Sequence, residues 1–140
     1  MKGTRGTTKP QPVDPKQVKS FLASAFKKLA AAEKTADIDV DAAYELAYGA
    51  MTKASLALML SHGQRPRAIP GHHQVIIGFC QQHLPVPDKN IFAMFDRMRR
   101  KRIQTFYDVA LVGEQELQDA LMTAREYLNL VRVELDRRHP

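Results

Sequence analysis

The chain has 140 residues, of which 44% are hydrophobic and 26% are charged, and these proportions are typical of one globular domain. No apolar run approaches the roughly 20 residues that a membrane-spanning helix needs. The single cysteine, Cys80, excludes an intramolecular disulfide and a zinc site built from several cysteines. Residues 1–13 contribute +3 of the formal net charge of +6, and a local basic cluster at residues 97–102 favours a partner that carries phosphate groups.

Residues 1–13 are predicted to form a disordered basic tail. They contain Lys2, Arg5 and Lys9 but no acidic residue, and glycines and prolines largely replace apolar side chains that could pack in a core. The segment also lacks the apolar stretch of a secretory signal. Together with the lone cysteine, this composition predicts a cytoplasmic protein.

Residues 14–140 are predicted to form a single helical domain. Asp14 and Pro15 are typical of a helix start, and apolar residues then recur at helical spacing to about residue 35. Asp39 favours the start of a second helix, which is apolar around much of its circumference and is expected to be the most buried. Gly63 is the expected end of that helix.

Three more helices are expected in the second half of the chain. Prolines delimit a third helix at roughly residues 70–84, and Asp88 can cap a fourth. The last helix is expected from about Gly113 to Arg138 and has the most regular apolar spacing. No segment alternates apolar and polar residues with period two, so no strands are expected. The sequence therefore predicts an all-α, up-and-down bundle of four to five helices.

Basic residues are concentrated in the fourth predicted helix, where five of the six positions from Arg97 to Arg102 are lysine or arginine. The simplest interpretation is a solvated helix face. The apolar stripe of Phe95 and Met98, however, continues at Arg102, and a guanidinium that faces the bundle needs a carboxylate, carbonyl groups or a phosphate. We therefore expect Arg102 in a cleft or at an interface. The predicted phosphate-binding or RNA-binding residues are Arg99, Arg100, Lys101 and Arg102.

The fourth helix also carries an unusual number of apolar residues. It has more than one inward stripe requires, and exposed apolar residues of this kind typically mark an interface. This surplus predicts a homodimer. The residues concerned are Ile91, Phe92, Phe95, Met98 and Phe106.

Several short motifs occur in one order along roughly residues 40–138. Gly63-Gln64-Arg65-Pro66 is followed by Gly71-His72-His73, by Arg102 to Asp108 and by Ala124-Arg125-Glu126-Tyr127-Leu128 in the final helix. In this arrangement the chain resembles the HEPN domains of prokaryotes. The resemblance implies a four- or five-helix bundle, often a homodimer in which arginine motifs face one another across the interface.

The motif of that family is an arginine, usually followed by asparagine, and a histidine four to six residues further on. Carried over to this chain, Arg102 matches the arginine, Ile103 replaces the asparagine and Tyr107 stands at the histidine. An unperturbed tyrosine has a pKa of about 10, whereas histidine titrates near neutrality, so Tyr107 is a poor replacement for a catalytic base.

The resemblance implies an RNA-binding or metal-independent RNA-cleaving protein, with Arg102 and Tyr107 as candidate catalytic residues of an endoribonuclease. His72 and His73 are expected to cap the third helix or to line the Arg102 cleft, together with Asp108. No cofactor and no metal site is predicted, because no carboxylate accompanies the histidines and the cysteine of the third helix.

The resemblance also implies a setting and partners for the protein. The setting is a toxin-antitoxin or phage-defence system, and the partners are RNA or another phosphate-bearing ligand, a second copy of the chain, and an antitoxin or a nucleotidyltransferase. The alternative is a non-catalytic interaction or dimerisation module that binds no nucleic acid.

Overall fold

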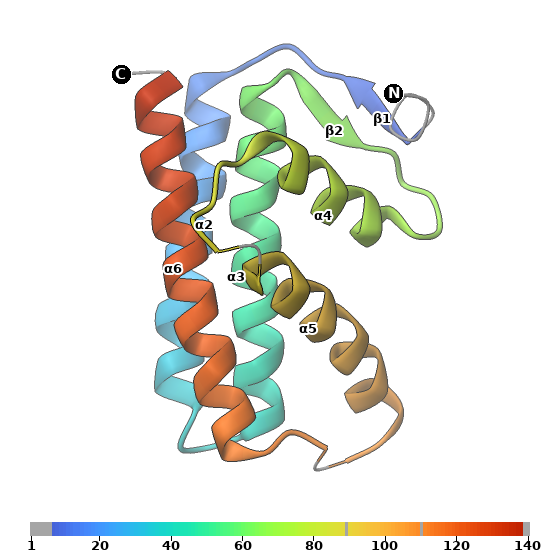
Figure 1. Cartoon of the computed structure of the whole chain (residues 1–140), viewed down its shortest axis with the longest axis vertical. Coiled ribbons are helices and arrows are strands. Elements are labelled where there is room, and N and C mark those ends of the chain that lie inside the picture. Colours follow the sequence, from blue (N-terminus) through green and yellow to red (C-terminus); the bar gives the residue numbers. More distant parts are fainter. Residues whose placement is uncertain (1–6, 89, 110, 139–140) are drawn as a thin grey trace.

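The computed structural model of the chain describes residues 7–88, 90–109 and 111–138 (Figure 1). Within these residues the chain folds into a bundle of five helices and one pair of short strands. The predicted all-α bundle is therefore confirmed, with the strand pair as an addition. In chain order the elements are β1 (Thr8–Pro10), α2 (Pro15–Thr35), α3 (Val40–Ser61), β2 (Gln64–Pro66), α4 (His72–His83), α5 (Asn90–Tyr107) and α6 (Glu114–Arg138).

The predicted capping residues begin and end the helices. The Asp14 carboxylate accepts a hydrogen bond from the Lys16 backbone N–H at 3.0 Å, and Asp39 caps α3 in the same way through the N–H of Ala42 at 3.1 Å. Gly63 follows α3 with a φ of 71°, a left-handed conformation that favours glycine. These local signals explain why these helix ends could be predicted correctly from the sequence.

The long helices α2, α3 and α6 pack side by side, and α4 and α5 cover one flank of α3 (Figure 1). Helix α3 is buried along most of its length, as predicted, because it contacts all four other helices. Its alanines let neighbouring helices approach closely. Among the described helices, none combines the length and apolarity that a membrane crossing requires.

Residues 1–13 were expected to be disordered, and no strands were expected in the chain. Both expectations are wrong for Thr8–Pro10, which forms the strand β1. This strand pairs antiparallel with β2, so that Thr8 lies opposite Pro66 and Pro10 lies opposite Gln64. Backbone groups make this pairing, and neither apolar side chains nor a period of two is needed to form it. Residues 1–6 of the predicted tail lie outside the described residues.

The apolar surplus predicted for the fourth helix is accounted for inside the chain. Helix α5 packs against three other helices, α3, α4 and α6, and therefore needs more than one apolar stripe. Of the five residues named for a dimer interface, only Phe106 is exposed. The four that are buried within the chain are Ile91, Phe92, Phe95 and Met98.

Replacing Gly78 of α4 with alanine is expected to stabilise the protein. A Cβ atom at this position has no neighbour within 4 Å, and alanine is favoured over glycine in a helix by up to about 1 kcal/mol. Urea denaturation of both proteins measures the gain in free energy of unfolding. Gly71→Ala is the matched contrast, because the φ of 81° at Gly71 makes any other residue strained and destabilising. A loss of stability in Gly78→Ala would contradict the prediction.

Candidate functional site

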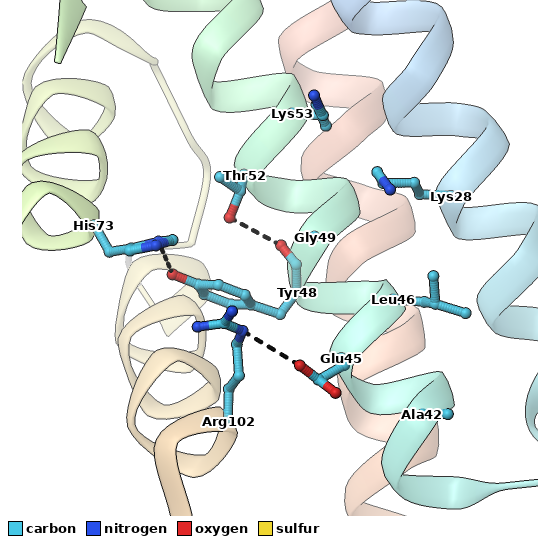
Figure 2. Close-up of a pocket in the computed structure, with 10 residues that line it drawn as sticks. All are labelled: Lys28, Ala42, Glu45, Leu46, Tyr48, Gly49, Thr52, Lys53, His73 and Arg102. Carbon is cyan, nitrogen blue, oxygen red and sulfur yellow. Dashed lines mark hydrogen bonds and ion pairs between the residues drawn. The ribbon is translucent and has the colours of Figure 1, made fainter. Parts of the chain in front are cut away.

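A groove of about 460 Å³ lies along α3, with α2 on one side and α4 and α5 on the other (Figure 2). Three cations from three helices line it: Lys28 of α2, Lys53 of α3 and Arg102 of α5. One carboxylate, Glu45, accompanies them. The remaining lining residues are Ala42, Leu46, Tyr48, Gly49, Thr52 and His73.

Arg102 lies over the aromatic ring of Tyr48 at the edge of this groove (Figure 2). The guanidinium carbon is 5.7 Å from the ring centroid, and Nε is 3.6 Å from Oε1 of Glu45. Even so, 42% of the Arg102 side chain is exposed. The ring and the carboxylate thus hold the guanidinium in place and leave several of its five N–H donors accessible to a ligand.

Tyr48 connects Arg102 to a histidine from another helix. Its hydroxyl lies 2.8 Å from Nδ1 of His73, and the two rings are 5.7 Å apart between centroids (Figure 2). Burial raises the pKa of Tyr48, so the hydroxyl keeps its proton at neutral pH. Burial, followed by electrostatic repulsion from His72, Arg102 and Arg99, lowers the pKa of His73. His73 is therefore neutral at pH 7.

The other predicted phosphate-binding residues lie outside the groove lining. Arg99 and Arg100 both pair with Asp96, with nitrogen to oxygen distances of 2.9 and 3.4 Å. Lys101 lies 3.4 Å from a carboxylate oxygen of Glu116 at the start of α6. Successive residues of a helix are about 100° apart, so neighbouring basic residues point in different directions. The basic segment is therefore divided among several faces of α5.

Tyr107 does not join Arg102 in the groove. Helix α5 continues to Tyr107, and five residues of helix correspond to a rotation of about 140°. The Tyr107 side chain is exposed and contacts the ring of Phe106 edge to face. Asp108 is also exposed, and its carboxylate accepts a hydrogen bond from the Val109 backbone N–H. The structure therefore does not bring Tyr107 or Asp108 together with Arg102 within one chain.

The two adjacent histidines occupy different places. His73 lines the groove, whereas His72 contacts the Ile69 carbonyl oxygen through Nδ1 at 3.2 Å, and its ring lies 4.3 Å from that of His73 between centroids, tilted by 38°. Gly71, not a histidine, occupies the N-cap position of α4. Cys80 is buried and its thiol points to the Ser55 carbonyl oxygen. Across the described ranges, no group of three or more His, Cys, Asp and Glu side chains is placed to hold a metal ion.

Sequence reasoning did not find Lys28, Lys53 and Glu45, because charged residues on the outer face of a helix are common. The Tyr48 ring is buried in the core, but Tyr48 also lines the groove, and its hydroxyl contacts His73. Gly49 was the one sequence signal for this groove, because a glycine inside a helix often marks a place where another part of the protein closely approaches the helix backbone. A Cβ atom at Gly49 would lie 3.7 Å from Cδ of Lys28.

Comparison with known proteins relates this chain to a protein family. The family model described as HEPN domain matches residues 18–134, a range that contains every lining residue of the groove. Neither the curated proteins nor the solved structures gave a match to the chain. The family match spans well over half of the sequence and confirms the resemblance seen in its motifs. The chain therefore belongs to the HEPN domain family.

Proposed function

We propose that this HEPN-domain protein binds RNA through the phosphate groups of its backbone, in the groove along α3. The observation that carries the proposal is the position of Lys28, Lys53 and Arg102, which come from three helices and line one groove with a single carboxylate. HEPN domains are associated broadly with RNA-related or nucleotide-binding functions.

The groove has the chemistry that a sugar-phosphate backbone requires. Arg102 can donate two parallel hydrogen bonds to one phosphate group, and its contact with Tyr48 keeps the guanidinium oriented. Lys28 and Lys53 act as point charges, and the small Ala42 leaves room for a strand beside α3. Contacts of this kind position a strand without reading its sequence.

Binding is the proposed activity rather than cleavage by Arg102 and Tyr107. That pair does not assemble in one chain, because Tyr107 is exposed at the far end of α5. A toxin-antitoxin or phage-defence setting, with an antitoxin or a nucleotidyltransferase as partner, stays a prediction from the family resemblance.

The affinity for single-stranded RNA is expected to fall steeply as salt is raised. Each phosphate contact releases counterions and contributes a slope of about 0.7 in a plot of log affinity against log salt, so three contacts give about 2. Fluorescence anisotropy with labelled RNA measures this slope. Lys53→Gln should lower this slope. Lys101→Gln is the matched control and should not lower the slope, because Lys101 pairs with Glu116 outside the groove. Absence of RNA affinity at low salt would refute the proposed function.

A second candidate function is homodimerisation, which the exposed apolar end of α5 favours. Figure 1 shows this end leaning away from α3 and α6, and exposed apolar patches typically mark interfaces. The exposed fractions are 49% for Ile103, 78% for Phe106, 83% for Tyr107 and 81% for Val109.

Light scattering is expected to give a mass of about twice the 15.8 kDa of one chain. Phe106→Glu should yield monomers, because a buried charge at the interface is costly. Met122→Glu is the matched control, since Met122 is also exposed but lies on α6, outside the patch. A monomeric wild-type protein at micromolar concentration would contradict this candidate function.

A further inference from the structure

The proposed binding of phosphate by Lys28, Lys53 and Arg102 does not use the hydrogen bond between the Tyr48 hydroxyl and His73. A hydrogen bond needs one donor and one acceptor, and a neutral imidazole has one of each. Once His73 is protonated, both of its ring nitrogens are donors, and the Tyr48 oxygen can only accept from Nδ1. The Tyr48 hydroxyl can serve either state, so the 2.8 Å contact persists when His73 gains a proton.

The second ring nitrogen of His73 is available to a ligand. Among the described residues, Nδ1 is the atom through which His73 makes its hydrogen bond, and Nε2 has no such partner. The ring lines the groove together with Arg102. A protonated His73 would therefore offer Nε2–H as a donor whichever tautomer the neutral ring has, and it would add one positive charge to the site.

The surroundings of His73 oppose its protonation while the groove is empty. The arginines of α5 outweigh the two carboxylates nearby, because Asp96 pairs with Arg99 and Arg100, and Glu45 pairs with Arg102. A phosphate group in the groove would reverse this balance by supplying negative charge. The charged and titratable groups around the Tyr48–His73 contact are Glu45 of α3, His72 of α4, and Asp96, Arg99 and Arg102 of α5.

We propose that His73 is a phosphate-binding residue of the groove, which takes up a proton when RNA binds and is held in place by the Tyr48 hydroxyl. The inference rests on the proposed function, because the RNA backbone supplies the negative charge. The proton comes from solvent and resides on the imidazole ring, with Nδ1–H donating to Tyr48 and Nε2–H donating to a phosphate oxygen.

The direction in which RNA affinity changes with pH follows from the thermodynamic linkage between proton binding at His73 and RNA binding. Burial and the neighbouring cations lower the pKa of His73 in the free protein, and a bound phosphate raises that pKa. RNA affinity therefore increases as pH falls through the window between the two values. Outside that window the protonation state of His73 is the same in both forms, and affinity no longer changes with pH through this residue.

The probe is an oligouridylate with a free 5′-hydroxyl end, because neither uracil nor an internal phosphodiester titrates in the range where histidine does, about pH 5.5 to 8. Affinity is measured by anisotropy at constant low salt across that range. Calorimetry in two buffers with different heats of ionisation counts the protons taken up on binding. The variants are His73→Gln, Tyr48→Phe and His83→Gln.

Wild-type affinity is expected to rise as pH falls, by up to about tenfold per pH unit, the limit for one proton. His73→Gln should bind more weakly at low pH and lose most of the proton uptake. Tyr48→Phe should reduce the uptake while its ring still supports Arg102. His83→Gln should behave like the wild type, because His83 lies at the other end of α4 and contacts the Phe79 carbonyl oxygen.

Two results would overturn the inference, and they differ in what they say of the proposed function. If the oligouridylate binds and His73→Gln retains the wild-type pH dependence, the inference fails and RNA binding in the groove stands. If the wild-type protein binds no RNA at any pH at low salt, both fail. Equal melting temperatures of His73→Gln and the wild type establish that a loss of uptake reflects the site and not the fold.

Discussion

Replacing Arg102 with alanine is expected to lower RNA affinity by roughly thirtyfold, which corresponds to about 2 kcal/mol for the loss of charge-assisted hydrogen bonds. Stability should change by less than about 1 kcal/mol. Arg102 and Glu45 are both about half exposed and 3.6 Å apart, and solvent screens such a pair. Alanine also favours the helical conformation. Anisotropy measures the affinity, and thermal denaturation measures the stability.

Arg100→Ala is the matched control for this prediction. Arg100 lies two residues away on the same helix and pairs with Asp96, but it does not line the groove. The change removes the same charge, so a general loss of electrostatic attraction would affect both variants equally. Equal RNA affinity of the two variants would contradict the assignment of Arg102 to the site. A loss of several kcal/mol of stability in Arg102→Ala would instead indicate a structural role.

Much of the fold could be predicted because its determinants are local. Asp14, Asp39 and Gly63 act on the backbone within a few residues, so the helix ends could be located from the sequence. The spacing of Phe95 and Met98 predicted Arg102 in a cleft or at an interface, and in the structure Arg102 lines the groove along α3. Pairing of β1 with β2 could not be predicted, since it joins backbone groups more than 50 residues apart.

The candidate site depends on contacts between helices, which a single sequence does not contain. Tyr48 and His73 are 25 residues apart, and their contact requires the packing of α4 against α3. The family motif directed attention to Tyr107, whose position in sequence is right for a partner of Arg102 but whose helical rotation is wrong. The histidine beside Arg102 comes from another helix.

Phe95→Ala is expected to have the largest effect on stability. The Phe95 ring is fully buried and packs edge to face against Tyr48 and Tyr127, with centroid distances of 5.6 and 5.3 Å. Removal of such a side chain leaves a cavity and costs about 3 to 5 kcal/mol, a large part of the stability of a small domain. Urea denaturation measures the loss in free energy of unfolding.

Met122→Ala is the control, because it also shortens a large apolar side chain to alanine, at a residue of α6 that is 71% exposed and outside the proposed dimer patch, where about 0.5 kcal/mol or less is expected. Since Phe95 packs against the Tyr48 ring on which Arg102 lies, the milder Phe95→Leu should keep the fold and still weaken RNA binding. If Phe95→Leu binds RNA as the wild type does, the core beneath Tyr48 does not position Arg102. If Phe95→Ala costs no more than Met122→Ala, α5 is not packed against α3 and α6 as the structure places it.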